Sequence, residues 1–332
     1  MATLASGLLI GARPRRERAR AEVKTISIVT PCFNEEGGIA ECYEAVRRVM
    51  ATLPGYAYEH VFIDNDSQDR TQLILRGIAA RDRRVKVILN ARNFGPARSP
   101  YHAILQSEAD AVVPVLSDLQ TPPELIPEMI RLWEGGAKVV VAIRRSSGEG
   151  GLMPLLRGAF YRLMRSVSTV DQIPNFMGYG LYDRRVIETL RGLNEPEPYF
   201  RGLVCEIGFE RASIEYDQPP RRHGRSSYNL LRLIDFALLG LSSYSRAPLR
   251  LMTLGGMTVA ALSLLIGFGY LVAKLLFWYS LPAGTAPILI AVFFLGAVQI
   301  FAIGILGEYI GLVLSYTRRF PLVVEKERIN FD

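Results

Sequence analysis

The sequence of 332 residues is poor in cysteine and histidine, with three residues of each. Cys32, Cys42 and Cys205 are too few and too scattered for a disulfide framework or a zinc site, and their scarcity fits a reducing compartment. No GxGxxG motif follows the first apolar run, and no GxxxxGK[ST] motif occurs. These absences argue against a disulfide-stabilised secreted protein, a zinc enzyme, a dinucleotide oxidoreductase and a P-loop enzyme.

An excess of negative charge is also lacking. Lysine and arginine total 39 against 32 acidic residues, which gives a net charge of +7. Such a balance favours an anionic partner, for example the phosphates of a nucleotide or a lipid. The basic residues do not form one continuous stripe, which argues against nucleic acid. Residues 1–23 place a short apolar stretch before their arginines, the wrong order for a signal peptide, and predict a flexible basic N-terminus.

Long apolar runs are absent from most of the chain but dominate its C-terminal third. Residues 251–278 carry one charge, Lys274, and residues 286–316 are interrupted by Gln299 and Glu308. A membrane-spanning helix needs roughly 20 apolar residues. Buried core helices are the alternative, although such helices are rarely apolar all round over this length. The two polar residues predict helix–helix contact in the bilayer, either within one chain or in a homo-oligomer.

The charges around these runs predict their orientation. Positive charges flank both ends of the predicted two-helix transmembrane hairpin, residues 251–316: Arg246, Arg250, Arg318, Arg319, Lys326 and Arg328. The connection at residues 279–285 has no charge. We therefore expect an integral plasma (inner) membrane protein whose termini and soluble part, including a tail at residues 317–332, are cytoplasmic. Residues 228–250 predict an interfacial amphipathic helix, or alternatively an ordinary amphipathic helix packed on the soluble domain.

The first two thirds of the chain alternate between β-rich runs and helical stretches. The runs occur at residues 26–30, 58–64, 85–89, 109–116 and 137–143. This alternation predicts βαβ units and a mostly parallel, Rossmann-like sheet. Ligands of such sheets bind beyond the carboxyl ends of the strands. Polar clusters follow these runs and predict an active site there: Asn34 and Glu35, Asp64 to Asp66, Asp118 and Gln120, and Arg144 and Arg145.

The stretch "SDLQTPP", residues 117–123, places a carboxylate and an amide at the exit of a buried strand. Two-residue spacing in an extended chain points Asp118 and Gln120 the same way. Hard oxygen ligands of this kind suit a divalent cation that keeps further positions for water and phosphate. The alternative is a helix N-cap, with Asp118 or Thr121 opening a helix at residues 124–134. For Asp69, before "RTQLIL", the N-cap is the preferred interpretation.

Several motifs occur in a fixed order: "TPCFNEE", "FIDNDSQDRT", "ARNFG", "SDLQTPPELI", "YDRRVI" and "RRHGRSSYN", followed by the apolar runs. Over residues 24–325 the chain resembles family 2 glycosyltransferases, in particular the membrane-anchored branch with dolichyl-phosphate mannose synthase and bacterial polyprenyl-phosphate glucosyltransferases. The resemblance implies an α/β domain of the GT-A fold over residues 24–227. It also implies a metal-assisted, inverting transfer from a nucleotide sugar.

The resemblance implies roles by position. Asp118 and Gln120 match the last two ligand positions of the family's Asp-x-Asp-x-Gln motif and would hold Mg²⁺ or Mn²⁺. The nucleotide pocket would contain Pro31, Phe33, Asn34, Glu35, Asp64 and Asn65. The phosphate of the acceptor would contact Arg144, Arg157, Arg221 and Ser226. Arg221 would also close over the reacting phosphates, so that Asp118 and Arg221 would be catalytic.

The chain departs from the family pattern at several positions. Leu116 occupies the place of the first aspartate of Asp-x-Asp, which leaves the metal site one ligand fewer. Asn65 and Asp66 stand where an aspartate and a glycine are usual. The segment Gly178–Gly180 lacks the acidic residue and the arginine that the family has there. These changes leave metal affinity and acceptor identity less determined than the fold.

Charge predicts the mechanism and the alternatives. The second pKa of a phosphate monoester is about 6, so a lipid phosphate is largely a dianion at neutral pH and needs positioning rather than a strong base. Transfer to a sugar hydroxyl of a lipid-linked glycan would need a carboxylate base. Glu206 in "FRGLVCEIGF" is the candidate, with a surface acid as the other interpretation. A third hypothesis is a non-catalytic scaffold in the membrane that binds nucleotide sugar.

Overall fold

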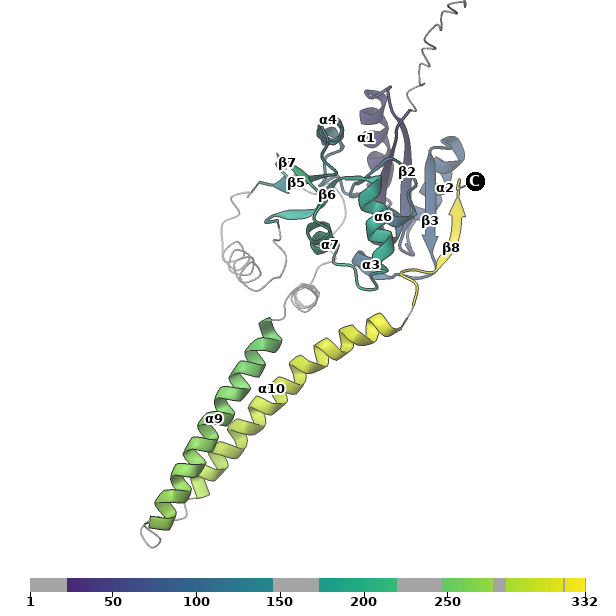
Figure 1. Cartoon of the computed structure of the whole chain (residues 1–332). Coiled ribbons are helices and arrows are strands. Elements are labelled where there is room, and N and C mark those ends of the chain that lie inside the picture. Colours follow the sequence, from purple (N-terminus) through teal and green to yellow (C-terminus); the bar gives the residue numbers. More distant parts are fainter. Residues whose placement is uncertain (1–22, 146–172, 220–246, 277–284, 319, 332) are drawn as a thin grey trace, which may run out of the picture.

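A computed structural model of the chain describes residues 23–145, 173–219, 247–276, 285–318 and 320–331. An α/β domain carries two long helices that project from one side (Figure 1). The strands are β1 (Thr25–Cys32), β2 (Ala57–Asp64), β3 (Val85–Asn90), β4 (Ala111–Pro114), β5 (Val139–Arg144), β6 (Phe176–Asp183), β7 (Arg211–Tyr216) and β8 (Glu325–Ile329). The helices are α1 (Ile39–Ala51), α2 (Thr71–Arg81), α3 (Gly95–Gln106), the 3₁₀ turn η1 (Pro123–Leu125), α4 (Ile126–Glu134), α6 (Arg184–Leu193), α7 (Phe200–Glu206), α9 (Ala247–Leu276) and α10 (Thr285–Thr317).

The strands form one sheet in the order β7-β5-β6-β4-β1-β2-β3-β8. Strand β1 lies in the middle and pairs in parallel with β2 and β4. The pairs β2–β3 and β5–β7 are also parallel, whereas β6 and β8 run antiparallel to their neighbours. The predicted α/β fold with a mostly parallel sheet is therefore confirmed, and each of the five predicted runs forms a strand.

Helices cover both faces of the sheet, which explains why its central strands are apolar throughout. Ile26 and Ile28 of β1 pack in one cluster with residues of α1 and α4, among them Val46 and Trp133. Val29 points to the opposite face, where it joins Tyr101 of α3. A parallel sheet buried on both sides has continuous hydrophobic runs instead of alternating ones. This pattern made the central strands recognisable in the sequence.

The carboxyl ends of the parallel strands face the long helices. In Figure 1 strand β8 points away from α9 and α10, toward the C-terminus. Since β3 runs antiparallel to β8 and parallel to β2, the strands β1, β2, β3 and β4 run toward the side from which the two helices project. The edge of the sheet at which the polar clusters were predicted therefore lies on the side of α9 and α10.

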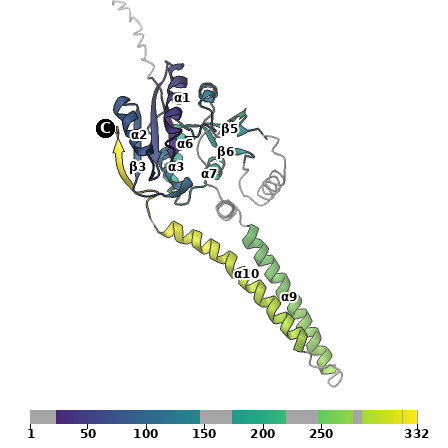
Figure 2. The ribbon, with the colours of Figure 1, turned by 180° about the vertical axis from the view of Figure 1, so that it is seen from behind.

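The two apolar runs form helices that lie side by side at their far ends and separate toward the domain (Figure 2). Within the described chain, Phe294–Thr317 is long and apolar enough to cross a membrane, and its apolar window is not buried in the protein. The second span stays a prediction. Ala247 to Arg250 form the first turn of α9, whereas the rest of the predicted interfacial helix and residues 1–22 lie outside the described residues. Residues 325–329 of the predicted tail form β8.

Candidate active site

The loops after β1 and β2 are hydrogen-bonded to each other. The backbone N–H of Asn34 donates to Ser67 Oγ at 2.8 Å, and Asn34 Oδ1 accepts from the N–H of Gln68 at 2.8 Å. The N–H of Glu35 donates to Thr71 Oγ1 at 2.9 Å. Asn34 adopts a φ of 54°, in the left-handed region that asparagine tolerates better than most residues. The predicted nucleotide-binding residues Asn34 and Glu35 therefore stand on a loop with a fixed backbone. Beside them, Pro31 is half-buried and Phe33 is exposed.

Asp64 at the end of β2 organises the following loop. Its side chain is fully buried, and Oδ2 accepts hydrogen bonds from the N–H of Ser67 at 2.9 Å and from Gln72 Nε2 at 2.8 Å. Burial raises the pKa of the neighbouring Cys32 thiol, and the charges of Asp64 and Glu35 raise it further. The predicted place of Asp64 in the nucleotide pocket stays a prediction.

Asn65, which stands where the family has an aspartate, joins the β2 loop to the loop after β3. Its Nδ2 donates to Asn93 Oδ1 at 2.9 Å and to the carbonyl of Gly95 at 3.2 Å. Its Oδ1 accepts from Asn90 Nδ2 at 3.1 Å and from the N–H of Phe94 at 2.9 Å. An amide both donates and accepts, which a carboxylate cannot do. The motif "ARNFG" thus acts in this chain through its bonds to Asn65, a role that sequence reasoning missed.

The Asp118 loop, residues 115–122, follows the end of β4. The N–H of Val115 continues the ladder to Val29 at 2.8 Å, and the N–H of Leu116 donates to Thr121 Oγ1 at 2.7 Å. Asp118 Oδ1 accepts from the N–H of Gln120 at 3.1 Å. Asp118 is 8% exposed and Gln120 is half-buried. The alternative of a helix N-cap is wrong, because the N-cap residues of η1 and α4 are Pro122 and Leu125, and neither helix start has a side-chain cap.

The loops after β1, β2 and β4 each contain a non-glycine residue in the left-handed region. The φ angles are 54° at Asn34, 65° at Asp66 and 56° at Leu119. For leucine this conformation costs roughly 1–2 kcal/mol, and such strain is typical of functional sites. The predicted N-cap Asp69 is one residue off, because the N-cap of α2 is Arg70. Asp69 Oδ1 nevertheless accepts from the N–H of Thr71, the first residue of the helix, at 2.9 Å.

The register of β1 places Asp64 on one side of this strand and the Asp118 loop on the other. Cys32 pairs with Asp64 on β2, and Val29 pairs with Pro114 just before the Asp118 loop. Burial raises the pKa of the Cys42 thiol on α1 to about 12, and the charges of Asp118 and Glu35 contribute to the rise. Because both carboxylates act on the same thiol, the β1 and β4 loops bring negative charge to one region.

The donor set at this edge suits a hard divalent cation. Within the described ranges, no group of three or more histidine, cysteine or acidic side chains could hold a metal ion. Asp118 offers a carboxylate and Gln120 an amide oxygen, and Leu116, in the place of the first aspartate of the family motif, is 39% exposed. Mg²⁺ and similar ions accept one or two protein carboxylates and complete their shell with water and phosphate oxygens. The residues present therefore fit a cation that is shared with a diphosphate.

Two arginines stand at the end of β5, which β6 separates from β4 in the sheet: Arg144 is the last residue of the strand, and Arg145 follows it. Arg144 Nη1 donates to Gln218 Oε1 at 2.6 Å, and its N–H donates to the carbonyl of Asn175 at 3.3 Å. Arg145 forms ion pairs with Glu215 at 3.2 Å and Asp217 at 3.4 Å. The side chain of Arg144 thus bonds to a neutral amide, whereas Arg145 pairs with two carboxylates. The other predicted phosphate-binding residues lie outside the described residues: Arg157, Arg221 and Ser226.

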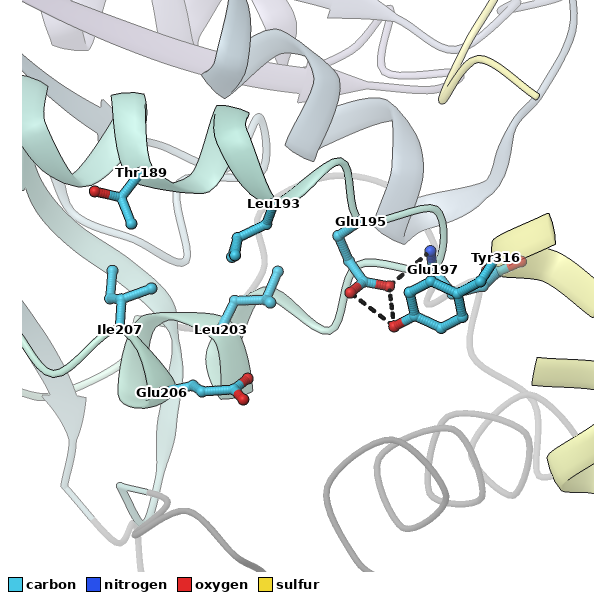
Figure 3. A pocket seen from close by; sticks show the side chains of 8 residues that line it. All are labelled: Thr189, Leu193, Glu195, Glu197, Leu203, Glu206, Ile207 and Tyr316. Atoms are coloured by element: carbon cyan, nitrogen blue, oxygen red, sulfur yellow. Dashed lines mark hydrogen bonds between the residues drawn. The ribbon is translucent and has the colours of Figure 1, made fainter. Parts of the chain in front are cut away.

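Glu206 on α7 lies in a different place. It lines a cavity of about 420 Å³ between α6, α7 and the end of α10 (Figure 3). Both carboxylate oxygens of Glu195 accept from Tyr316 Oη at 2.8 Å there, and burial raises the pKa of Glu195. The complete lining is Thr189, Leu193, Glu195, Glu197, Leu203, Glu206, Ile207 and Tyr316. It includes no residue of the loops after β1, β2 and β4.

Comparisons with known proteins agree with the geometry. Residues 27–191 match the family model Glycosyl transferase family 2. The chain is 35% identical over 302 residues to the bactoprenol glucosyl transferase of Shigella phage SfV, covering 91% of this chain and 98% of the relative. It is 32% identical over 302 residues to the prophage bactoprenol glucosyl transferase homolog of Escherichia coli (strain K12), with 91% and 98% covered.

Among solved structures, the glucosyl-3-phosphoglycerate synthase from Mycobacterium tuberculosis in complex with Mn²⁺, uridine diphosphate and phosphoglyceric acid has a TM-score of 0.45 at 18% identity, and the match covers 66% of this chain and 76% of that chain. The family follows from the sequence relatives, because these align with the chain over nearly its whole length, through the α/β domain and the apolar helices. The chain belongs to glycosyl transferase family 2 and is a glycosyltransferase.

Proposed function

We propose that the chain transfers one hexose, glucose in the first instance, from a nucleotide diphosphate sugar to a polyprenyl phosphate at the cytoplasmic face of the membrane. The observation that carries this proposal is the match to bactoprenol glucosyl transferases over 91% of the chain. The direction of the strands supports it, since the carboxyl ends of β1, β2 and β4 face the side of α9 and α10 (Figure 1). A lipid head group at the membrane surface would lie on that side.

The reaction forms a bond between a phosphate oxygen of the lipid and the anomeric carbon, while the bond from that carbon to the diphosphate breaks. The lipid phosphate is already a dianion at neutral pH, so it attacks without a general base. Arg144 positions it, because a guanidinium can grip phosphate through two parallel hydrogen bonds. The fixed loops after β1 and β2 orient the nucleotide. A divalent cation held by Asp118 and Gln120 would screen the charge of the leaving diphosphate.

The experiment combines purified protein, radiolabelled nucleotide sugars and a short polyprenyl phosphate, with and without Mg²⁺ or Mn²⁺. We expect label from UDP-glucose or another donor in the organic phase. Label that appears only on a glycan acceptor would instead support transfer to a hydroxyl. Binding of donor without transfer to any acceptor would support the scaffold hypothesis.

Asp118→Asn tests the metal assignment in the same assay. The variant keeps the shape of the side chain and removes its charge, so we expect a loss of transfer of about a hundredfold or more. Glu128→Gln is the matched control, because this acid lies exposed on α4 and, among the described residues, forms only a long ion pair with Arg131 at 3.7 Å. Full activity of Asp118→Asn would remove Asp118 from the metal site.

A further inference from the structure

The start of α7 is fixed against β6 by an aromatic anchor. The ring of Phe200 packs edge-on against Tyr182, with 5.1 Å between centroids, and lies 6.2 Å from the ring of Tyr101. Gly178 has a φ of 89°, and a Cβ at this position would lie 3.4 Å from Phe200 Cδ1. The glycine thus permits both the turn of the chain and the close approach of the ring. The next residue, Arg201, is therefore held in place by its backbone.

The side chain of Arg201 extends to the end of the β5–β6 pair. Its guanidinium lies 5.5 Å from the centroid of the Tyr199 ring, and Nη1 lies 3.6 Å from Met177 Sδ. Met177 is 54% exposed although it is a large apolar residue. Two residues before it, the carbonyl of Asn175 accepts the N–H of Arg144. Arg144 and Arg201, which come from different elements, thus contact the same short segment, residues 175–177.

This segment belongs to the edge at which the site was placed. Strand β6 runs antiparallel to both β4 and β5, so its first residues lie where β4 and β5 end. Ile143, one residue before Arg144, pairs with Phe176. The exposed thioether and the two arginines that contact this segment therefore belong to the edge of the sheet at which β4 and β5 end.

We propose that Arg201 binds the phosphate of the prenyl phosphate acceptor together with Arg144, and that Met177 contacts the first isoprenoid units of the same lipid. This inference rests on the proposed function and names a phosphate-binding residue that the motifs do not contain. A phosphate dianion carries three acceptor oxygens and is best held by more than one guanidinium. An unbranched thioether adapts to an irregular apolar chain.

The test measures binding of farnesyl phosphate, farnesol and inorganic phosphate to the full-length protein in detergent, next to the KM for each substrate of the transfer reaction. We expect Arg201→Gln to weaken binding of farnesyl phosphate and to raise the KM for polyprenyl phosphate about tenfold or more, with the KM for nucleotide sugar unchanged. Arg201→Lys should recover part of the loss. Met177→Ser should weaken binding of farnesyl phosphate and farnesol but not of inorganic phosphate.

Arg131→Gln on α4 is the matched control and should leave every value unchanged, because within the part of the chain that the structure describes this exposed arginine pairs only with Glu128 on its own helix. Farnesyl phosphate binding by Arg201→Gln at the affinity of the wild type would overturn the inference, and so would an equal loss for farnesol. Failure of the proposed function has a different signature, in which the wild type transfers sugar to no polyprenyl phosphate. The binding measurement still decides the role of Arg201 in that case, and Met177→Ser tests the lipid contact of the same inference if Arg201→Gln does not fold.

Discussion

His60 shows how the centre of the sheet restricts a titratable side chain. It is 1% exposed on β2, its Nε2 lies 2.9 Å from Thr30 Oγ1, and its ring stacks on Phe62 with centroids 4.0 Å apart. Its Nδ1 has no hydrogen-bond partner within the described chain. Burial lowers the pKa of the imidazole from 6.5 to about 3, because the charged form loses its hydration there.

This histidine makes the folded state sensitive to mild acid. Between pH 6.5 and about 3 the unfolded chain binds a proton at His60 that the folded chain does not bind, so stability falls as the pH falls through this window. The slope is at most about 1.4 kcal/mol per pH unit for one proton. We expect thermal unfolding between pH 7 and pH 5 to show a smaller loss of stability in His60→Gln than in the wild type. Equal slopes would contradict the assignment.

Among the elements, the Asp118 loop depends on a neighbouring strand. Tyr179 of β6 is 2% exposed, and its hydroxyl donates to the carbonyl of Pro122. Its ring packs edge-on against Tyr216 with 5.6 Å between centroids. The segment Gly178–Gly180, which lacks the charged residues usual in the family, thus supplies a clamp for the loop that carries Asp118 and Gln120.

Tyr179→Phe tests this clamp. The change leaves the packing intact but removes a buried hydrogen bond, so we expect a loss of roughly 1–3 kcal/mol in the free energy of unfolding. Because the loop carries the metal ligands, we also expect a higher metal concentration for half-maximal transfer. Tyr43→Phe is the control, since its hydroxyl donates to Asp82 Oδ2 at 3.0 Å away from the loop. An unchanged metal requirement in Tyr179→Phe would leave Tyr179 a purely structural role.

The elements also show what the sequence could and could not predict. Strands β1 to β5 were predictable because burial on both faces makes them continuous apolar runs. Strand β6 was missed because it contains Gly178 and Gly180, yet a Cβ at Gly180 would lie 2.2 Å from the carbonyl oxygen of Val140, so only glycine fits there. Strand β7 and the charged β8, "EKERI", lie at the edges of the sheet, where polar side chains are favoured.

The candidate site, like the strands, could be predicted from the sequence only in part. The polar clusters at the strand ends were predictable, because the carboxyl ends of parallel strands meet at one edge. The bonds that fix them were not, since they join residues far apart in the chain, such as Asn65 with Asn90 and Tyr179 with Pro122. Arg201 carried no signal of its own, because only the fold brings it to Met177 and the end of β5.

Over the whole molecule, the chain leaves the α/β domain, forms the two long helices and returns to the same sheet. Strand β8 pairs with β3 after α10 (Figure 1). Arg76 of α2 binds Glu327 through two hydrogen bonds, one of them 2.7 Å long, and His102 of α3 contacts Glu325 at 2.6 Å. Tyr316 of α10 adds the contact with Glu195. These contacts attach the helices to the domain at their C-terminal end.

Asn330 is the residue through which this attachment is best tested. Its Nδ2 donates to the carbonyls of Ala79 and Val85 at 2.9 Å and 2.8 Å, and its φ of 61° is one that glycine adopts freely. Asn330→Gly removes both bonds without backbone strain, so we expect the free energy of unfolding to fall by about 1–3 kcal/mol. Thermal unfolding in detergent measures this change, and Lys326→Ala on the exposed side of β8 is the control.

Removal of residues 320–332 is the stronger form of the same test. It uncovers the edge of β3, whose residues Val87 and Ile88 are fully buried, and an exposed apolar strand edge pairs readily with other chains. We expect the shortened protein to aggregate on size-exclusion chromatography at a temperature at which the wild type and Lys326→Ala remain monodisperse. If the shortened protein and Asn330→Gly both unfold at the temperature of the wild type, the return of the chain to the sheet does not stabilise the domain.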